Sequence, residues 1–154
     1  MTIQEKKLVL NKCKELNDDI NKDIEQLARL KSLAVKTTPT LSLMPKATSG
    51  DDRLQSTCEK IELQQWKINH KTDSLIDLKK SIMADIEMSV NDDILKALLK
   101  YKYIYLLNFK DTAYRLNIKE TTARKKKCVQ ALKQIVISEK TQYIAKTLDR
   151  GHKM

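Results

Sequence analysis

The sequence has few of the residues that build turns, and few aromatic side chains. Its 154 residues include two glycines, two prolines, one tryptophan and one phenylalanine, and aromatic residues make up 5%. β-Sandwiches and barrels need many turns, and nucleotide-binding folds need glycine-rich loops, so this composition argues against all of them. It favours an all-α protein built from long helices.

Cysteine and histidine are also scarce, and their positions argue against a metal site. The three cysteines, Cys13, Cys58 and Cys128, are far apart and form no CxxC motif, which opposes a disulfide framework and fits a reducing cytoplasm. The two histidines, His70 and His152, have no ligand partner near them in the sequence. Because the sequence also lacks a phosphate-binding glycine loop and a convincing nucleophile–base pair, we expect no enzyme activity, no cofactor and no small-molecule substrate.

Long apolar runs are absent as well. No run reaches the ~18 residues that a transmembrane helix needs, and the first ten residues, MTIQEKKLVL, lack the apolar segment of a signal peptide. We therefore expect a cytoplasmic protein without a membrane partner.

The formal net charge of +10 is concentrated in one part of the chain. Residues 94–154 carry 15 Lys/Arg and 4 Asp/Glu, whereas residues 1–52 carry 9 and 8, and residues 53–93 carry 6 and 8. A basic region joined to a nearly neutral one suggests an end that binds a polyanion and an end that binds protein. The alternative is a basic surface kept only for solubility.

The first region, residues 1–90, predicts two long helices. Residues 3–35 repeat apolar positions every seven residues, at Cys13, Ile20, Leu27 and Ala34. Residues 52–88 do the same at Leu54, Ile61, Ile68, Leu75 and Ile82. The intervening residues 36–52 predict a loop, since no helix is expected to cross Pro39 or Pro45. We expect an antiparallel helical hairpin that forms a homodimer through its remaining apolar surface; a purely intramolecular bundle is the alternative.

The second region, residues 91–154, predicts a small trihelical domain with a helix-turn-helix. We expect an apolar helix over 94–107, a short helix over 111–116, a turn at Asn117 and a second helix from about residue 119 past residue 135 toward residue 148. Asn117 tolerates the left-handed conformation that such a turn requires. The small Ala113 lets the second helix cross close to the first. Four cations, 124–127, lie in the first half of this second helix, the part that enters the major groove in the motif.

Residues 98–135 resemble the region 4 helix-turn-helix of bacterial sigma factors. Asp111-Thr112-Ala113 takes the place of that family's acidic–aliphatic–Ala triplet, and Leu116-Asn117-Ile118 takes the place of its Leu-Gly-aliphatic turn. With the helical N-terminal region and the segment LSLMP at 41–45, the order of parts resembles small phage regulators of the ArpU/RinA late-gene activator type. Four positions depart from the pattern. Thr112 stands for an aliphatic residue and Asn117 for glycine. Lys119 stands where Ser or Thr caps the second helix, so that this cap is lost or moves by a residue, and Lys126 stands where an apolar residue faces the first helix.

The resemblance implies a sequence-specific double-stranded DNA-binding transcription regulator, an activator of phage late or packaging genes in a bacterial host. Arg124 would read guanine through its planar fork, and Lys125 and Lys127 would neutralise phosphate. The other expected DNA contacts are Thr121 and Thr122 on the helix, and Lys110, Arg115 and Lys119 around the turn. The basic tail after residue 135 would pack on the domain, contact flanking DNA or contact host RNA polymerase. The alternative for the four cations is a solvated helix face.

Two further binding functions fit the same residues. A DNA-packaging adaptor of the small-terminase type would form a larger ring and contact a motor protein, whereas a regulator would form a dimer on two half-sites. A protein–protein interaction module acting through the coiled coil would keep its activity in an Arg124→Ala variant.

Overall fold

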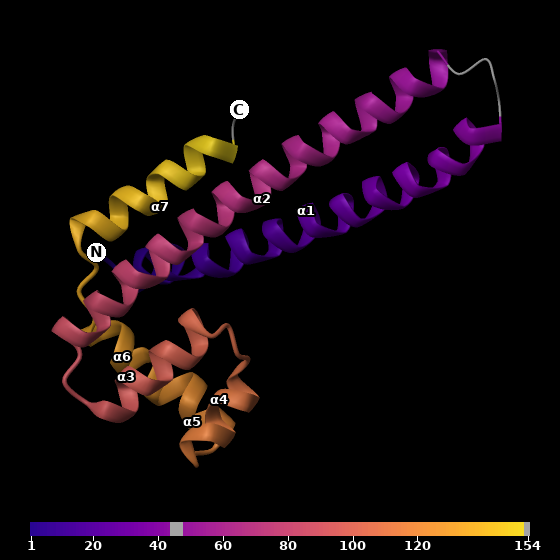
Figure 1. Cartoon of the computed structure of the whole chain (residues 1–154). Helices are drawn as coiled ribbons and strands as arrows, with labels where there is room; N and C mark the ends of the chain where they lie inside the picture. Colours follow the sequence, from indigo (N-terminus) through magenta and orange to yellow (C-terminus); the bar gives the residue numbers. More distant parts are fainter. Residues whose placement is uncertain (44–47, 153–154) are drawn as a thin grey trace. The chain divides into compact units, whose positions relative to one another are not determined.

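The computed structural model describes the backbone of residues 1–43 and 48–152 and the side chains of residues 1–35 and 53–150. All regular structure in these residues is helical, which confirms the all-α fold class (Figure 1). The α-helices are α1 (Ile3–Leu43), α2 (Thr48–Ser89), α3 (Asp93–Leu99), α4 (Phe109–Leu116), α5 (Glu120–Thr122), α6 (Cys128–Gln134) and α7 (Glu139–His152). Two π-helical segments are η1 (Lys100–Ile104) and η2 (Ala123–Lys127). None of the helices in the described ranges is both long and apolar enough to cross a membrane.

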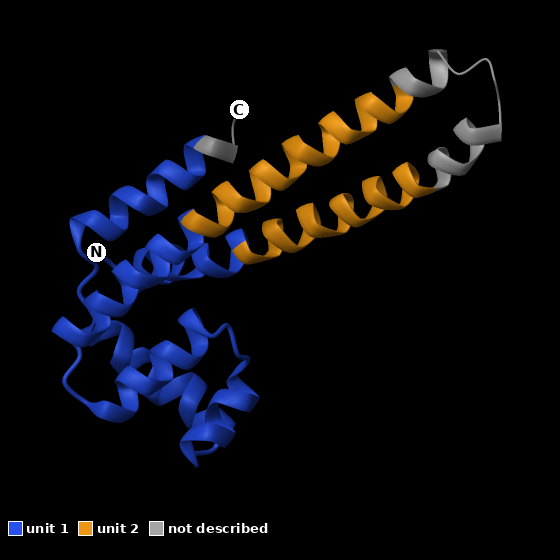
Figure 2. Ribbon diagram, in the orientation of Figure 1, with its two compact units in different colours: residues 1–16, 74–154 blue, residues 17–73 orange. Residues whose placement is uncertain are grey.

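The chain divides into two compact units (Figure 2). Unit 1 comprises residues 1–16 and 74–154, and unit 2 comprises residues 17–73. The predicted boundary at residue 90 therefore falls inside unit 1. The physical reason is that the ends of both long helices are buried with the later helices: Leu10 of α1, Leu78 and Ile86 of α2, and Leu132 of α6 all have no exposed surface.

Unit 2 is an antiparallel hairpin of α1 and α2, as the heptads predict. Lys71 forms an ion pair with Asp23 at 2.7 Å, and the Gln64 amide donates to the Asp23 carbonyl oxygen at 3.0 Å and to the Gln26 side chain at 3.3 Å. Gln26, later in α1, pairs with Gln64, earlier in α2, whereas Asp23 pairs with the later Lys71. The two helices therefore run in opposite directions. Of the side chains described in this unit, Ile20 and Gln64 are buried, which is a thin core.

The predicted loop over residues 36–52 is wrong for most of its length. Helix α1 continues through Pro39 to Leu43, and α2 begins at Thr48. The remaining residues, 44–47, which include Pro45, lie outside the described residues. A proline inside a helix removes one hydrogen bond and costs about 3 kcal/mol. A helix of 41 residues tolerates that cost at Pro39, where one turn remains before its end.

The second helix of the helix-turn-helix does not continue past residue 135, in contrast to the expectation. Ile135 is extended, with φ −64° and ψ 134°, and α7 starts at Glu139. Two hydrogen bonds to α2 hold this break: the Val136 N–H donates to Ser89 Oγ at 3.0 Å, and the Ser138 N–H donates to the Asp85 carboxylate at 3.1 Å. The helix ends because tertiary contacts fix an extended segment there.

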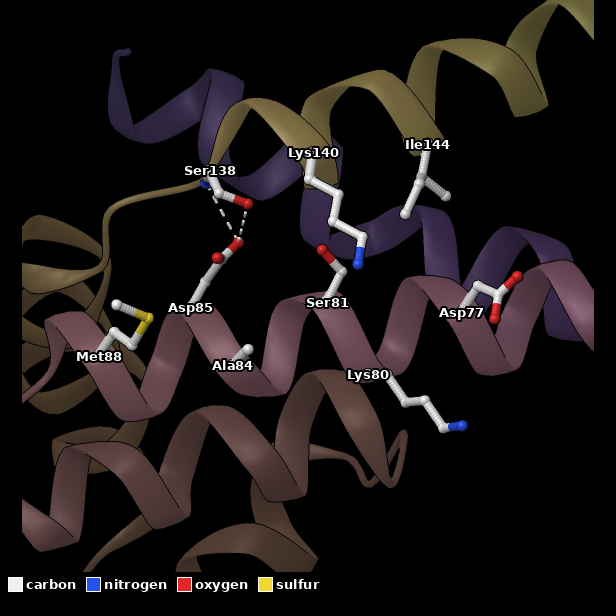
Figure 3. Close-up of a pocket in the computed structure, with 9 residues that line it drawn as sticks. All are labelled: Asp77, Lys80, Ser81, Ala84, Asp85, Met88, Ser138, Lys140 and Ile144. Carbon is white, nitrogen blue, oxygen red and sulfur yellow. Dashed lines mark hydrogen bonds between the residues drawn. The ribbon is translucent and has the colours of Figure 1, made fainter.

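A polar cluster joins the start of α7 to α2 within unit 1. Figure 3 shows its hydrogen bonds between Ser138 and Asp85. The Asp85 carboxylate accepts hydrogen bonds from the Ser138 hydroxyl at 3.3 Å and the Thr141 hydroxyl at 2.6 Å. Ser81 and Thr141 share a further hydrogen bond of 2.6 Å. Thr141 has no exposed surface, and Ser81 and Asp85 are each 7% exposed. Since buried polar groups are costly without partners, this satisfied cluster fixes where α7 docks.

Candidate nucleic-acid interface

Helix α4, the first helix of the motif, is held at its start by side-chain hydrogen bonds. Asn108 is the N-cap, and its side-chain oxygen accepts from the Asp111 N–H at 2.8 Å. Thr112 stands where the sigma-like pattern has an aliphatic residue, yet it has no exposed surface. Its hydroxyl donates to the Asn108 carbonyl oxygen at 2.8 Å. The buried hydroxyl is therefore satisfied, and the departure from the pattern does not disturb the helix.

The turn after α4 confirms the prediction at Asn117. Asn117 is left-handed, with φ 56° and ψ 40°. The Ile118 N–H donates to the Ala113 carbonyl oxygen at 3.0 Å, and the Asn117 N–H donates to the Tyr114 carbonyl oxygen at 3.3 Å. These two bonds define the Schellman motif, which closes a helix and redirects the chain.

The second helix consists of α5, η2 and α6 in succession, from Glu120 to Gln134. Lys119 is its N-cap residue and makes no capping hydrogen bond through its side chain. Of the two outcomes expected for the Ser or Thr cap, it is therefore lost. Glu120 in the first turn is favourable there, because the N-terminal end of a helix carries partial positive charge.

The π-helical segment η2 coincides with the basic run and explains where Lys126 points. Ala123 has no exposed surface and Cys128, five residues later, is 3% exposed. In an α-helix the core position after Ala123 would fall three or four residues on, at Lys126 or Lys127. The wider turn adds one residue, so the core receives Cys128 while Lys126 is exposed and Lys127 half-buried. This removes the conflict over Lys126 without burying a charge.

Arg124, the residue predicted to read guanine, is held over a ring by a neighbouring carboxylate. Its guanidinium bonds to Glu120 at 2.9 Å, one helical turn earlier, and lies 5.3 Å from the centroid of the Phe109 ring. The ammonium of Lys102, from η1, lies 4.5 Å from the same centroid. Two cations therefore lie over the Phe109 ring: Lys102 from η1 and Arg124 from the second helix.

The structure brings the eight predicted contact residues onto α4, the turn and the first half of the second helix. Six are exposed and two, Thr122 and Lys127, are half-buried. The exposed six are Lys110, Arg115, Lys119, Thr121, Arg124 and Lys125. Arg115 is turned toward η1, with its guanidinium 5.7 Å from the Tyr101 ring centroid. No carboxylate in the described ranges forms an ion pair with Lys119 or Lys125, so their charges are available to a ligand.

Two further cations lie near this surface, Lys102 and Lys126, which are not among the predicted contact residues. The five-residue spacing from Ala123 to Cys128 is the sequence signal that could have placed Lys126 on the exposed side of the helix. The tyrosines beside Lys102 lie in the core and at its rim: Tyr103 is 5% exposed and Tyr105 is 61% exposed. Burial raises the pKa of Tyr103, whose hydroxyl donates to the sulfur of Cys128.

The surface as a whole presents cations, without the constellation of a metal site. In the part of the chain that the structure describes, no group of three or more His, Cys, Asp or Glu side chains could hold a metal ion. Exposed lysine and arginine side chains on a helix that follows a tight turn can bind phosphate groups and base edges.

No protein-family model, no curated protein and no solved structure matches this chain. Its function is therefore inferred from its own residues and their geometry.

Proposed function

We propose that this chain is a sequence-specific double-stranded DNA-binding transcription regulator of the phage ArpU/RinA late-gene activator type. The observation that carries the proposal is the Schellman turn at Asn117 followed by a helix whose exposed side carries Arg124, Lys125 and Lys126. A helix placed in this way after α4 enters the major groove in helix-turn-helix proteins. The cations beside it supply the salt-dependent affinity for the phosphate backbone.

Arg124 and the lysines have different roles in this proposal. Arg124 bonds two acceptors of one guanine. Its pair with Glu120 is exposed at 58% and 47% of the two side chains, so releasing it for DNA costs at most about 1 kcal/mol. Lys125, Lys126 and Lys127 neutralise phosphates, which fixes the register of the helix without reading sequence.

The proposed regulator is a homodimer through unit 2. That unit exposes Leu33 at 54%, Leu63 at 54% and Trp66 at 61%, with the Trp66 ring stacked on His70 at 5.2 Å. A two-helix hairpin with so little buried surface gains stability by covering these side chains with a second copy. Two helix-turn-helix motifs would then meet half-sites roughly 34–36 Å apart. An activator of this type would also contact host RNA polymerase.

The decisive experiment selects protein-bound fragments from the source genome. The best fragment is then titrated against a scrambled version of itself at several salt concentrations. We expect the selected fragment to bind at least about 10³-fold tighter, with log affinity falling against log salt by about 0.9 per phosphate contact. Equal binding of both fragments would overturn sequence-specific recognition.

Two variants separate the roles of the cations. Arg124→Ala should weaken binding of the selected fragment by about 1–3 kcal/mol and reduce its advantage in affinity over the scrambled fragment. Lys125→Gln should weaken binding of both fragments equally and make the slope of log affinity against log salt shallower by about 1. Lys80→Gln is the matched control, since Lys80 is an exposed lysine of α2 that lines a cavity between α2 and α7 and is not among the predicted contact residues. If Arg124→Ala leaves specificity unchanged, then the second helix does not read the sequence.

A further inference from the structure

A small cavity in unit 1 is lined by residues of α1, η1 and the segment before α4. Its volume is about 100 Å³, room for roughly three water molecules or for one phosphate group. The polar side chains around it are Asn11 and Lys14 from α1, Lys102 from η1, and Asn108, the N-cap of α4. Two asparagines and two lysines thus line one small space, together with Tyr103.

The cations around this cavity lack carboxylate partners. Neither Lys14 nor Lys102 forms an ion pair with any carboxylate in the described ranges. Burial, and then the positive charges of Lys14 and Arg124, lower the pKa of Lys102. Folding therefore brings together like charges from α1, η1 and η2. Such an arrangement is unfavourable alone and becomes favourable when an anion lies among the cations.

The same cations lead to the helix-turn-helix surface. Lys102 and Arg124 face one ring, that of Phe109, at 4.5 and 5.3 Å from its centroid. Lys102 contributes both to this contact and to the lining of the cavity that holds Lys14. An anion in the cavity would consequently lie beside Lys102, whose ammonium shares the Phe109 ring with Arg124.

We propose that Asn11, Lys14 and Lys102 bind a backbone phosphate of the DNA that flanks the bases read by the second helix. Helix α1 then belongs to the nucleic-acid interface, although it lies about 100 residues before the helix-turn-helix in the sequence. This inference rests on the proposed function and adds a phosphate contact from a second part of the chain. The contact carries no sequence information and positions the protein on the duplex.

The test uses the full chain with Lys14→Gln, Lys14→Arg and the control Lys80→Gln, each titrated with the selected and the scrambled fragment over a salt series. Lys14 is exposed, so these variants should fold as the wild type does. We expect Lys14→Gln to bind both fragments roughly fivefold more weakly at 0.15 M salt, with a slope shallower by about 0.9. Lys14→Arg, which keeps the charge, should restore both values, and Lys80→Gln should change neither. Lys102→Gln, checked for its melting temperature, should reproduce the shallower slope.

The outcomes separate this inference from the proposed function. Suppose that Lys14→Gln keeps the wild-type affinity and salt slope, while Lys125→Gln lowers the affinity and makes the slope shallower. The inference then fails and the proposed function stands. If the wild type itself shows no salt-dependent binding to DNA, the proposed function fails. Inorganic phosphate at constant ionic strength distinguishes the source of the anion. Should it raise the melting temperature of the wild type but not of Lys14→Gln, while DNA affinity is equal in both, the cavity takes free phosphate and the DNA contact is overturned.

Discussion

The two units differ in both charge and packing. Unit 1 carries 21 Lys/Arg and 11 Asp/Glu, whereas unit 2 carries 9 of each. Unit 1 also holds the large side chains that have almost no exposed surface, among them Leu10, Leu78 and Leu132, while the described part of unit 2 buries Ile20 and Gln64, each 7% exposed. The excess of positive charge is thus carried by the unit with the larger apolar core, whose burial opposes the repulsion among its cations. The neutral unit has little net repulsion among its charges and a small core.

The largest difference between the units should appear when a leucine is truncated in each. Leu132→Ala removes a side chain with no exposed surface and should lower the free energy of unfolding by about 2–5 kcal/mol. Leu63→Ala, at a residue 54% exposed, should change the free energy of unfolding of the dilute protein by less than about 0.5 kcal/mol. Urea denaturation measures both. Any larger cost of Leu63→Ala must grow with protein concentration, as a dimer contact would require; a cost independent of concentration would contradict the comparison.

A smaller difference should separate one aspartate of each unit. Asp85→Ala leaves the donors of half-buried Ser138 and buried Thr141 without their acceptor, and we expect the free energy of unfolding to fall by about 3 kcal/mol. Asp23→Ala removes the partner of Lys71, in a pair whose side chains are 15% and 29% exposed, and should cost about 1 kcal/mol or less. Thermal denaturation gives the values. Amide exchange in α7 should quicken in Asp85→Ala and stay unchanged in Asp23→Ala; equal exchange would show that the buried cluster does not hold α7.

The smallest difference should appear when one asparagine of each unit is replaced by alanine, because the change in stability should have opposite signs at the two positions. Asn117→Ala places an alanine in the left-handed region and should destabilise by about 1 kcal/mol, whereas Asn117→Gly should be close to neutral. Asn69, exposed inside α2, should behave in the opposite way, since alanine is the better helix former by about 0.5 kcal/mol. Denaturant midpoints measure all three variants. A destabilising Asn69→Ala would show that Asn69 has a partner in the assembled protein.

What the sequence predicted well depends on local chemistry. Asn117 is left-handed because its neighbours along the chain require a turn there. Asp92, a residue type that favours N-cap positions, caps α3 by accepting from the Ile94 N–H at 2.8 Å. The two long helices of the hairpin follow from apolar spacing. The turn, the cap and each long helix are decided by residues near one another along the chain, whereas the pairing of the two helices joins residues such as Asp23 and Lys71, 48 positions apart.

What the sequence did not predict depends on distant contacts or on a different helical period. The break at Ile135 is fixed by Ser89 and Asp85 of α2, about fifty residues away, and nothing local signals it. The π-helical turn at 123–127 was present in the sequence as a five-residue spacing between small apolar residues, which an analysis at 3.6 residues per turn overlooks. Residues 1–52 carry 9 Lys/Arg and 8 Asp/Glu, because acidic residues of unit 2 offset the lysines before residue 17, so the net charge of this stretch gives no sign of Lys14.

Unit 1 is assembled from two stretches of chain with the hairpin between them, and this sets an order of events during synthesis. The Lys6 ammonium donates to the Leu132 carbonyl oxygen, a partner 126 residues later. At ribosomal rates of about 5–20 residues per second, roughly 6–25 s separate the appearance of these two residues. Both halves of the hairpin emerge well before then. The nascent chain thus displays its first lysines and the apolar side of α1 for many seconds before the helices that cover them exist.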